Sequence, residues 1–342
     1  MNRRQFLGIA ATAPIAVHAK PDADAELPEA PNQTIAAAGK PAVMSFSRLQ
    51  IGVATGAQDV NAKVPFGGFA GRHLVLPQHV AERFHLIDVL VGRRSQLANS
   101  YSIPGELFQA GEPRVDFALD SSVRDEDVSL LVENISRDNV DFHGDLHGDV
   151  FDVSLPEWPH NERTYLLGYY EELTPLLGRA VVSRPQIVFT PRQLFVPRET
   201  LEHFAVRAIT VTRYGTNRRM WELNLSKVAT MSRSANGHAR WTWPKDAIGR
   251  PMNACVADQV AVIVENLTDT RRVFRAALLG DSDTIPFWSL RENQRNFVKR
   301  VHGLVQKLGV THYEAVQILD RRINMADMVL DGRIRIAKAV RP

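Results

Sequence analysis

The chain has 342 residues, 44% of them hydrophobic and 23% charged, with a formal net charge of +3. This composition excludes a disordered or fibrous chain, and no apolar run approaches the ~18–20 residues that span a bilayer, which excludes an integral membrane protein. The single cysteine, Cys255, excludes an intramolecular disulfide and a cysteine-based metal centre.

The amino terminus, residues 1–19, resembles a twin-arginine signal peptide. Arg3 and Arg4 precede Gln-Phe-Leu, and a short uncharged apolar stretch and small residues follow. A functional signal there would direct the protein to the periplasm or the extracellular space. The alternative is an uncleaved basic arm on a cytoplasmic or virion protein. Residues 20–42, rich in Ala, Pro and acidic groups, predict a flexible linker.

The chain contains an internal duplication. A shift of 120 residues aligns eight identical residues in the 27 positions 65–91, where chance gives about one or two. A shift of 132 then pairs Val132-Glu133-Asn134 with Val264-Glu265-Asn266, and Gly148-Asp149 with Gly280-Asp281. The change of shift implies about 12 extra residues in the second copy, within the stretch 229–250.

The duplicated segments have strand patterns. Residues 84–91 and 204–211 alternate apolar and polar positions, and 128–132 and 260–264 are continuous branched apolar runs. The segment 161–177 is the one stretch before residue 286 where we expect a helix. The fold class predicted is mainly β: two tandem antiparallel β-sandwich modules, immunoglobulin-like or jelly-roll-like, at residues 43–152 and 153–285.

The two modules share the pattern Phe-x-x-Arg-x-Leu-x-x-Pro at Phe69–Pro77 and Phe189–Pro197. On this pattern, the tandem duplication and the strand density, residues 43–285 resemble the double jelly-roll major capsid proteins of icosahedral viruses. The resemblance implies a structural protein that forms a homo-oligomer. It assigns no site residue.

Signatures of catalysis are missing: the sequence has no Gly-x-Ser-x-Gly, no phosphate-binding glycine loop and no His-Glu-x-x-His. One candidate metal site follows from His143, Asp145, His147 and Asp149, which would project from one face of an extended strand. Imidazole and carboxylate groups there would collect a divalent ion such as zinc or manganese. The alternative is the polar face of a half-solvated strand, since the second copy carries Arg275, Ala277 and Leu279 instead.

Two further regions are candidate contact surfaces. Trp241 and Trp243 would stack on a sugar or base, or else cover the second sandwich or anchor an interface. Residues 286–342 predict a helical tail with 11 Lys or Arg against 5 Asp or Glu. There Arg291, Arg295, Lys299 and Arg300 would meet nucleic acid or an acidic surface, or form a solvated helix face.

The sequence therefore favours a non-enzymatic, self-assembling structural protein, capsid-like or surface-layer-like, without a cofactor unless the strand face binds a metal. The alternative is an exported periplasmic binding protein or metalloenzyme.

Overall fold

The computed structural model describes residues 40–151 and 164–282, apart from short gaps, and eight residues between 299 and 319. The gaps are 54–55, 65–67, 93, 99–100, 117–118, 120–121, 124–126, 176–177, 215, 217, 245 and 250–251. No helix in the described part of the chain is long and apolar enough to cross a membrane.

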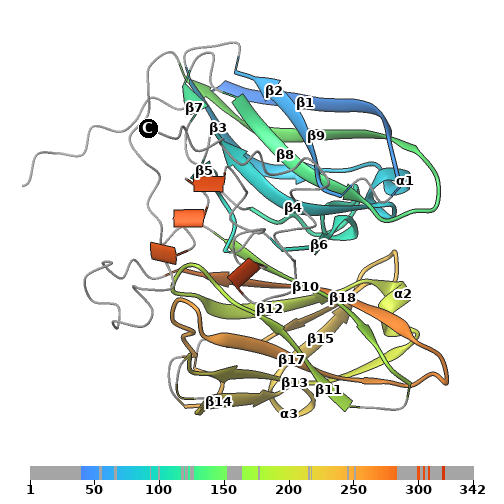
Figure 1. Ribbon diagram of the computed structural model, residues 1–342, viewed down its shortest axis with the longest axis vertical. Coiled ribbons are helices and arrows are strands. Elements are labelled where there is room, and N and C mark those ends of the chain that lie inside the picture. The colour runs from blue at the N-terminus through green and yellow to red at the C-terminus, as the bar shows by residue number, and fades with distance from the viewer. Residues whose placement is uncertain are drawn as a thin grey trace, which may run out of the picture. The chain divides into compact units, whose positions relative to one another are not determined.

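The first module consists of two antiparallel sheets (Figure 1). Its elements are β1 (Lys40–Ile51), β2 (Gln58–Lys63), β3 (Gly68–Val75), α1 (Gln78–Ala81), β4 (Phe84–Val91), β5 (Arg94–Ser95), β6 (Ile103–Pro104), the 3-10 turn η1 (Gly105–Phe108), β7 (Ser122–Val123), β8 (Asp127–Asn134) and β9 (Val140–Phe151). One sheet has the order β1-β9-β3-β7 and the other β2-β8-β4-β5, with β6 beside β4.

The second module repeats this arrangement. Its elements are β10 (Tyr165–Leu173), β11 (Gly178–Ser183), β12 (Thr190–Val196), α2 (Arg198–Leu201), β13 (Phe204–Thr212), β14 (Arg219–Asn224), α3 (Leu225–Val228), β15 (Thr230–Arg233), β16 (Ala239–Thr242), β17 (Gln259–Asn266) and β18 (Arg272–Asp281). The sheet orders are β10-β18-β12-β16-β15 and β11-β17-β13-β14. Two sandwiches with one common strand order confirm the predicted duplication, and this arrangement is a jelly roll.

Local irregularities also repeat. The β3–β9 ladder has a bulge between Gly71 and His73, and β12–β18 has one at the positions 120 residues later, Pro191 and Gln193. The β4–β8 and β13–β17 ladders share a second bulge, between Leu86 and Asp88 and between Val206 and Ala208. Because bulges re-aim the strand and are retained as specific features, their repetition shows that the two backbones are copies.

Equivalent side-chain contacts join the sheets within each module. Phe84 packs edge-on against Phe142 with ring centres 5.2 Å apart, and Phe204 against Phe274 at 5.5 Å. Asparagine ends the equivalent strands β8 and β17. Asn134 Oδ1 accepts from the backbone N–H of Ser136, and Asn266 Oδ1 from that of Thr268, so the same asparagine turn follows both strands.

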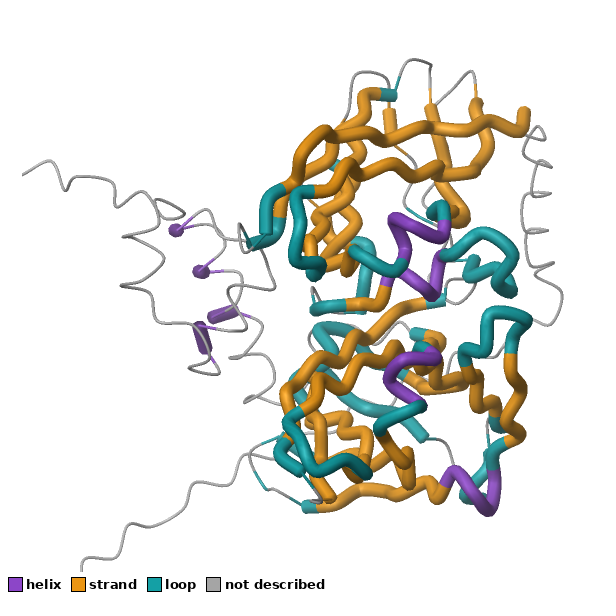
Figure 2. The backbone as a smooth tube through the Cα atoms, turned by 90° about the vertical axis from the view of Figure 1, so that its right-hand side faces the viewer, coloured by secondary structure: helices purple, strands orange, loops and turns teal. Residues whose placement is uncertain are grey.

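The strands of the two modules form two separate groups (Figure 2). Each module has its own core, built from the inward residues of both of its sheets. Phe69 and Phe189 are both buried, as are Val132 and Val264, so the matched positions occupy equivalent core sites. The first core also includes four outward residues of the second module: Leu166, Phe195, Ala277 and Leu279. The modules thus share a packed apolar junction within one compact unit, Gly39–Pro342.

The helix expected over 161–177 is wrong, because residues 165–173 form strand β10. Tyr165, Leu167 and Tyr169 face the second core, while Leu166 packs into the junction core. A strand covered on both faces has a continuous apolar run, which periodicity alone does not separate from a helix.

Several predictions lie mostly outside the described residues. These are the signal at 1–19, the linker at 20–42 up to residue 39, the module boundaries near 152 and 285, and most of the helical tail 286–342. Residues 40–42, expected in the linker, are the first residues of strand β1. Of that tail, the eight described residues are helical.

Candidate functional site: the outer face of β9 and the module junction

Strand β9 places its polar side chains as expected. Phe142 and Leu146 are buried in the first core, while His143 and Asp145 on the opposite face are exposed. Because successive residues of a strand alternate between faces, the four predicted metal ligands line the outside of the sheet.

Each of these four side chains contacts a residue outside the predicted set. The contacts are Asp145 with Ser45, Asp149 with Arg72, His147 with His73, and His143 with His79. The Ser45 hydroxyl donates to Asp145 Oδ1 at 2.7 Å, and Arg72 Nη2 lies 2.8 Å from Asp149 Oδ2. Among the described residues, no group of three or more His, Cys, Asp or Glu is placed to hold a metal ion. Metal binding by the four predicted residues stays a prediction.

Two histidines that the sequence did not single out lie on this face. His73 in β3 stacks on His147, with ring centres 4.9 Å apart and planes 9° from parallel. His79, in the short helix α1, brings Nε2 to 3.3 Å from Nε2 of His143. Neither histidine belongs to a sequence motif. The one feature of the sequence that could have pointed to them is that the second copy has different residues, Gln193 and Glu199, at the matching positions.

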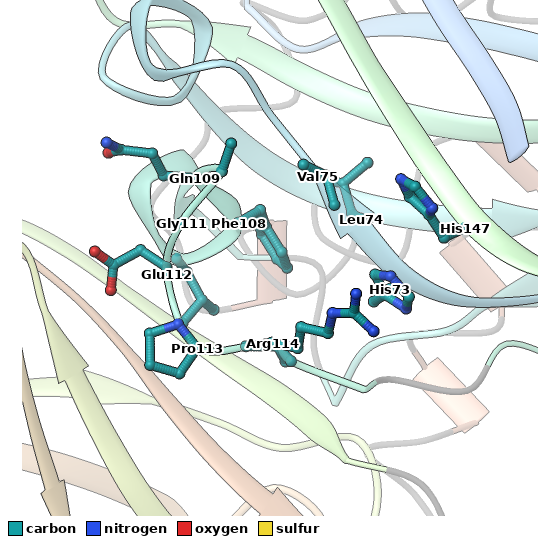
Figure 3. A pocket seen from close by; sticks show the side chains of 13 residues that line it. His73, Leu74, Val75, Phe108, Gln109, Gly111, Glu112, Pro113, Arg114 and His147 are labelled. Carbon is teal, nitrogen blue, oxygen red and sulfur yellow. The ribbon is translucent and has the colours of Figure 1, made fainter. Parts of the chain in front are cut away.

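A cavity of about 270 Å³ lies beside the stacked pair (Figure 3). It is bounded by β3 and the segment 107–115, and the guanidinium of Arg114 points toward His73. Burial lowers the pKa of His73, and the neighbouring charges of His147 and Arg114 lower it further. Both effects disfavour the protonated form of His73, and Arg114 is a cationic group at this end of the cavity.

The second module uses the equivalent sheet face to contact the first module. On β18, Phe274, Ala276 and Leu278 point into the second core, and Arg275, Ala277 and Leu279 point the other way. Ala277 and Leu279 belong to the first module's core cluster. Gly168 on β10 lies so close to segment 101–102 that a Cβ would be 2.4 Å from the Ser102 carbonyl oxygen.

The junction also contains a cluster of three charged side chains, of which Arg275 and Glu106 are buried. Arg275 Nη2 lies 3.2 Å from Glu106 Oε1 and 2.5 Å from Glu199 Oε2, and the side chains of Arg275 and Glu106 are 7% and 4% exposed. Burial raises the pKa of Glu106, while Arg275 opposes this shift. Burial, and then the charge of Arg275, lowers the pKa of fully buried His85, whose Nδ1 is hydrogen-bonded to Ser102.

Strand register relates the two faces. Leu74 pairs with Leu146, and Leu194 with Leu278, at the same place in the two ladders. The correspondences that follow are His143 with Arg275, Asp145 with Ala277, His147 with Leu279, and His79 with Glu199. The predicted metal face is therefore the counterpart of the face covered at the junction, and of its four residues His143 and Asp145 are exposed.

The other candidate residues are placed as follows. Trp241 and Trp243 are both buried in the second core, and Trp243 Nε1 donates to the Pro191 carbonyl. This position fits the packing alternative and leaves little indole surface for a ligand. Lys299 and Arg300 are exposed on a helical segment, and Arg291 and Arg295 lie outside the described residues. Polyanion binding by these four stays a prediction.

No family model matches the chain, and no curated protein matches it either. Among solved structures, the chain is similar to the major capsid protein P2 from bacteriophage PM2, at 10% identity over 71% of this chain and 98% of that chain, with a TM-score of 0.30. It is also similar to the STIV MCP, at 9% identity over 72% and 98%, with a TM-score of 0.33. The predicted resemblance to capsid proteins is confirmed at the level of architecture. At these TM-scores the similarity carries no argument about function. A proposal about function must therefore be argued from the residues of this chain.

Proposed function

We propose that this protein is a structural protein that assembles from copies of itself, as the subunit of a capsid-like or surface-layer-like array. One observation carries the proposal: in the described part of the chain, the outer face of β1 and β9 has exposed residues at positions that are buried at the junction in the second module. The chain already uses this face of a jelly roll for packing once, at β10 and β18. A second copy can use it again at β1 and β9.

The edge strand β1 supports this assignment. Among the described strands β1 pairs only with β9, so its other edge has no described partner. Val43 on the outer face is 54% exposed, and Leu49 is 76% exposed. A long edge strand with exposed apolar residues is a template for pairing with another chain, and soluble proteins usually protect such an edge. In the second module, Leu166 takes the place of Val43 and is buried at the junction.

Light scattering coupled to size-exclusion chromatography, with negative-stain electron microscopy, tests the proposal. The purified chain is expected to form species larger than a monomer, and Val43→Glu is expected to weaken them because it places a charge in the contact. Met231→Glu is the matched control, since Met231 is also exposed but lies on β15 of the other module. A chain that stays monomeric at every concentration, or a control that disrupts assembly equally, would overturn the proposal.

A binding protein is the second candidate, favoured by the cavity beside His73. The cationic guanidinium of Arg114, which points toward His73, suits a small anionic ligand. Titration calorimetry with small carboxylates and phosphate, comparing the wild-type chain with Arg114→Gln, would support this role if binding is seen and lost in the variant. No heat in either protein removes this candidate.

A further inference from the structure

We propose that His79 and His143 form a binding site for one divalent transition-metal ion, with Zn²⁺ as the representative ion. The two residues are 64 positions apart and come from different elements, α1 and the outer face of β9. Their Nε2 atoms lie 3.3 Å apart and both side chains are exposed, so an ion in solution can reach them. The site shares only His143 with the strand-face set predicted from sequence.

The distance fits the geometry of zinc. An ion held at about 2.05 Å by two imidazole nitrogens at the tetrahedral angle places those nitrogens about 3.3 Å apart. Nε2 is one of the two atoms through which neutral imidazole binds metals. Among the described residues no third histidine, cysteine or carboxylate joins the pair to form a metal-binding group, so water would fill the remaining two positions of a tetrahedral ion.

Nitrogen donors also determine which ions are favoured. Imidazole suits Zn²⁺, Cu²⁺ and Ni²⁺, whereas Mg²⁺ and Ca²⁺ prefer carboxylate, carbonyl and water oxygens. The pair should therefore discriminate strongly between Zn²⁺ and Mg²⁺ in the same titration.

The second module shows what the fold does at these positions. Glu199 and Arg275, the counterparts of His79 and His143, form an ion pair at 2.5 Å. In the first module α1 lies beside β9, and in the second module α2 lies beside β18. Each arrangement brings the ends of one helix side chain and one strand side chain together. In the second module the two groups carry opposite charges, while in the first module both groups are imidazoles.

The stacked pair His73 and His147 provides an internal control. The nitrogen lone pairs of imidazole lie in the ring plane, and these two planes are nearly parallel at 9°, so the lone pairs do not converge on one ion. His147 lies on the same strand and the same face as His143, four residues further on.

Isothermal titration calorimetry with ZnCl₂ on the metal-free, full-length chain tests the site. We expect one ion per chain and a loss of affinity of about tenfold or more in His79→Ala and in His143→Ala, because each removes one of two protein ligands. His147→Ala should leave the affinity within about twofold, since that ring does not ligate the ion. MgCl₂ should give no saturable binding. Thermal unfolding followed by circular dichroism checks that the variants are folded, which we expect because both side chains are exposed.

The outcomes separate the alternatives. If His79→Ala binds zinc as the wild-type chain does, the pair is a hydrogen-bonded imidazole contact and the proposal is overturned. If His147→Ala loses as much affinity as His143→Ala, the strand-face set binds the ion and the pair does not. Both ligands belong to one chain, so binding to monomeric protein supports the site whether or not the chain self-assembles.

Discussion

The outer face of β18 and the outer face of β9 occupy the same place in two copies of one fold and have opposite environments. On β18, Arg275, Ala277 and Leu279 are buried against the first module. On β9, the matching His143 and Asp145 are exposed. Strand order, bulges and core aromatics are shared, so the difference lies in the residues of one face. The backbone of a jelly roll therefore leaves this face free to be either a solvent surface or a contact surface.

Exchanging residues between these two faces should change the free energy of unfolding more than any other substitution proposed below. Ala277→Asp introduces the residue of the open face into the junction, where Ala277 is fully buried and pairs across the ladder with Gly168. An unpaired carboxylate there should cost about 4 kcal/mol or more of unfolding free energy. The reverse change, Asp145→Ala, should cost less than about 1 kcal/mol, because it removes one exposed hydrogen bond. Urea denaturation measures both, and equal costs would contradict the assignment of the two faces.

Removing the central cation of the junction should have the next largest effect. Arg275→Ala leaves Glu106 buried without its partner, which should cost about 3 kcal/mol. Arg72→Ala is the control, because the Arg72–Asp149 pair is partly exposed and should be worth at most about 1 kcal/mol. The double variant Glu106→Gln, Arg275→Met should recover much of the loss. Guanidinium denaturation of all four proteins checks this, and a cost for Arg275→Ala no larger than that of Arg72→Ala would contradict it.

A repeated close approach of two backbones should give equal effects in the two modules. A Cβ on Gly148 would lie 2.2 Å from the Ala70 carbonyl oxygen, and one on Gly280 2.3 Å from that of Thr190. Gly148→Ala and Gly280→Ala should each cost about 1–3 kcal/mol, because backbone must shift to admit the methyl group. Gly178→Ala, whose Cβ would have no neighbour closer than 3.9 Å, should change stability by less than about 0.5 kcal/mol. Thermal unfolding of the three variants would contradict the equivalence if the first two differed widely.

The smallest expected effect is a pH dependence from the junction. The pKa of His85 is lowered from 6.5 by burial and by Arg275. Because the unfolded chain binds the proton more readily, the stability contributed by neutral His85 is present above pH 6.5 and is lost as the pH falls toward the folded pKa. His85→Asn, whose side-chain amide retains a hydrogen-bonding group for Ser102, should reduce the slope of unfolding free energy against pH below 6.5. A slope unchanged by this substitution would assign the pH dependence to other groups.

Much of the fold could be predicted from the sequence, because the duplicated residues and the alternation of apolar and polar residues are visible without a structure. Residues 84–91 were predicted as a strand, and β4 has these bounds. The alternation around Phe142 correctly separated the core face of β9 from its outer face. Segment 161–177 failed, because both faces of β10 are covered, one by its own module and one by the other.

Sequence by itself determined the duplication, the strand-rich class and the polar character of the β9 face, since identities, turn residues and period-two patterns need no knowledge of partners. Only the tertiary structure decided what that face contacts. His79 and His143 meet because α1 folds back beside β9, and Arg275 is buried because the first module covers β18. Such contacts join residues between 64 and 190 positions apart, and no local pattern records them.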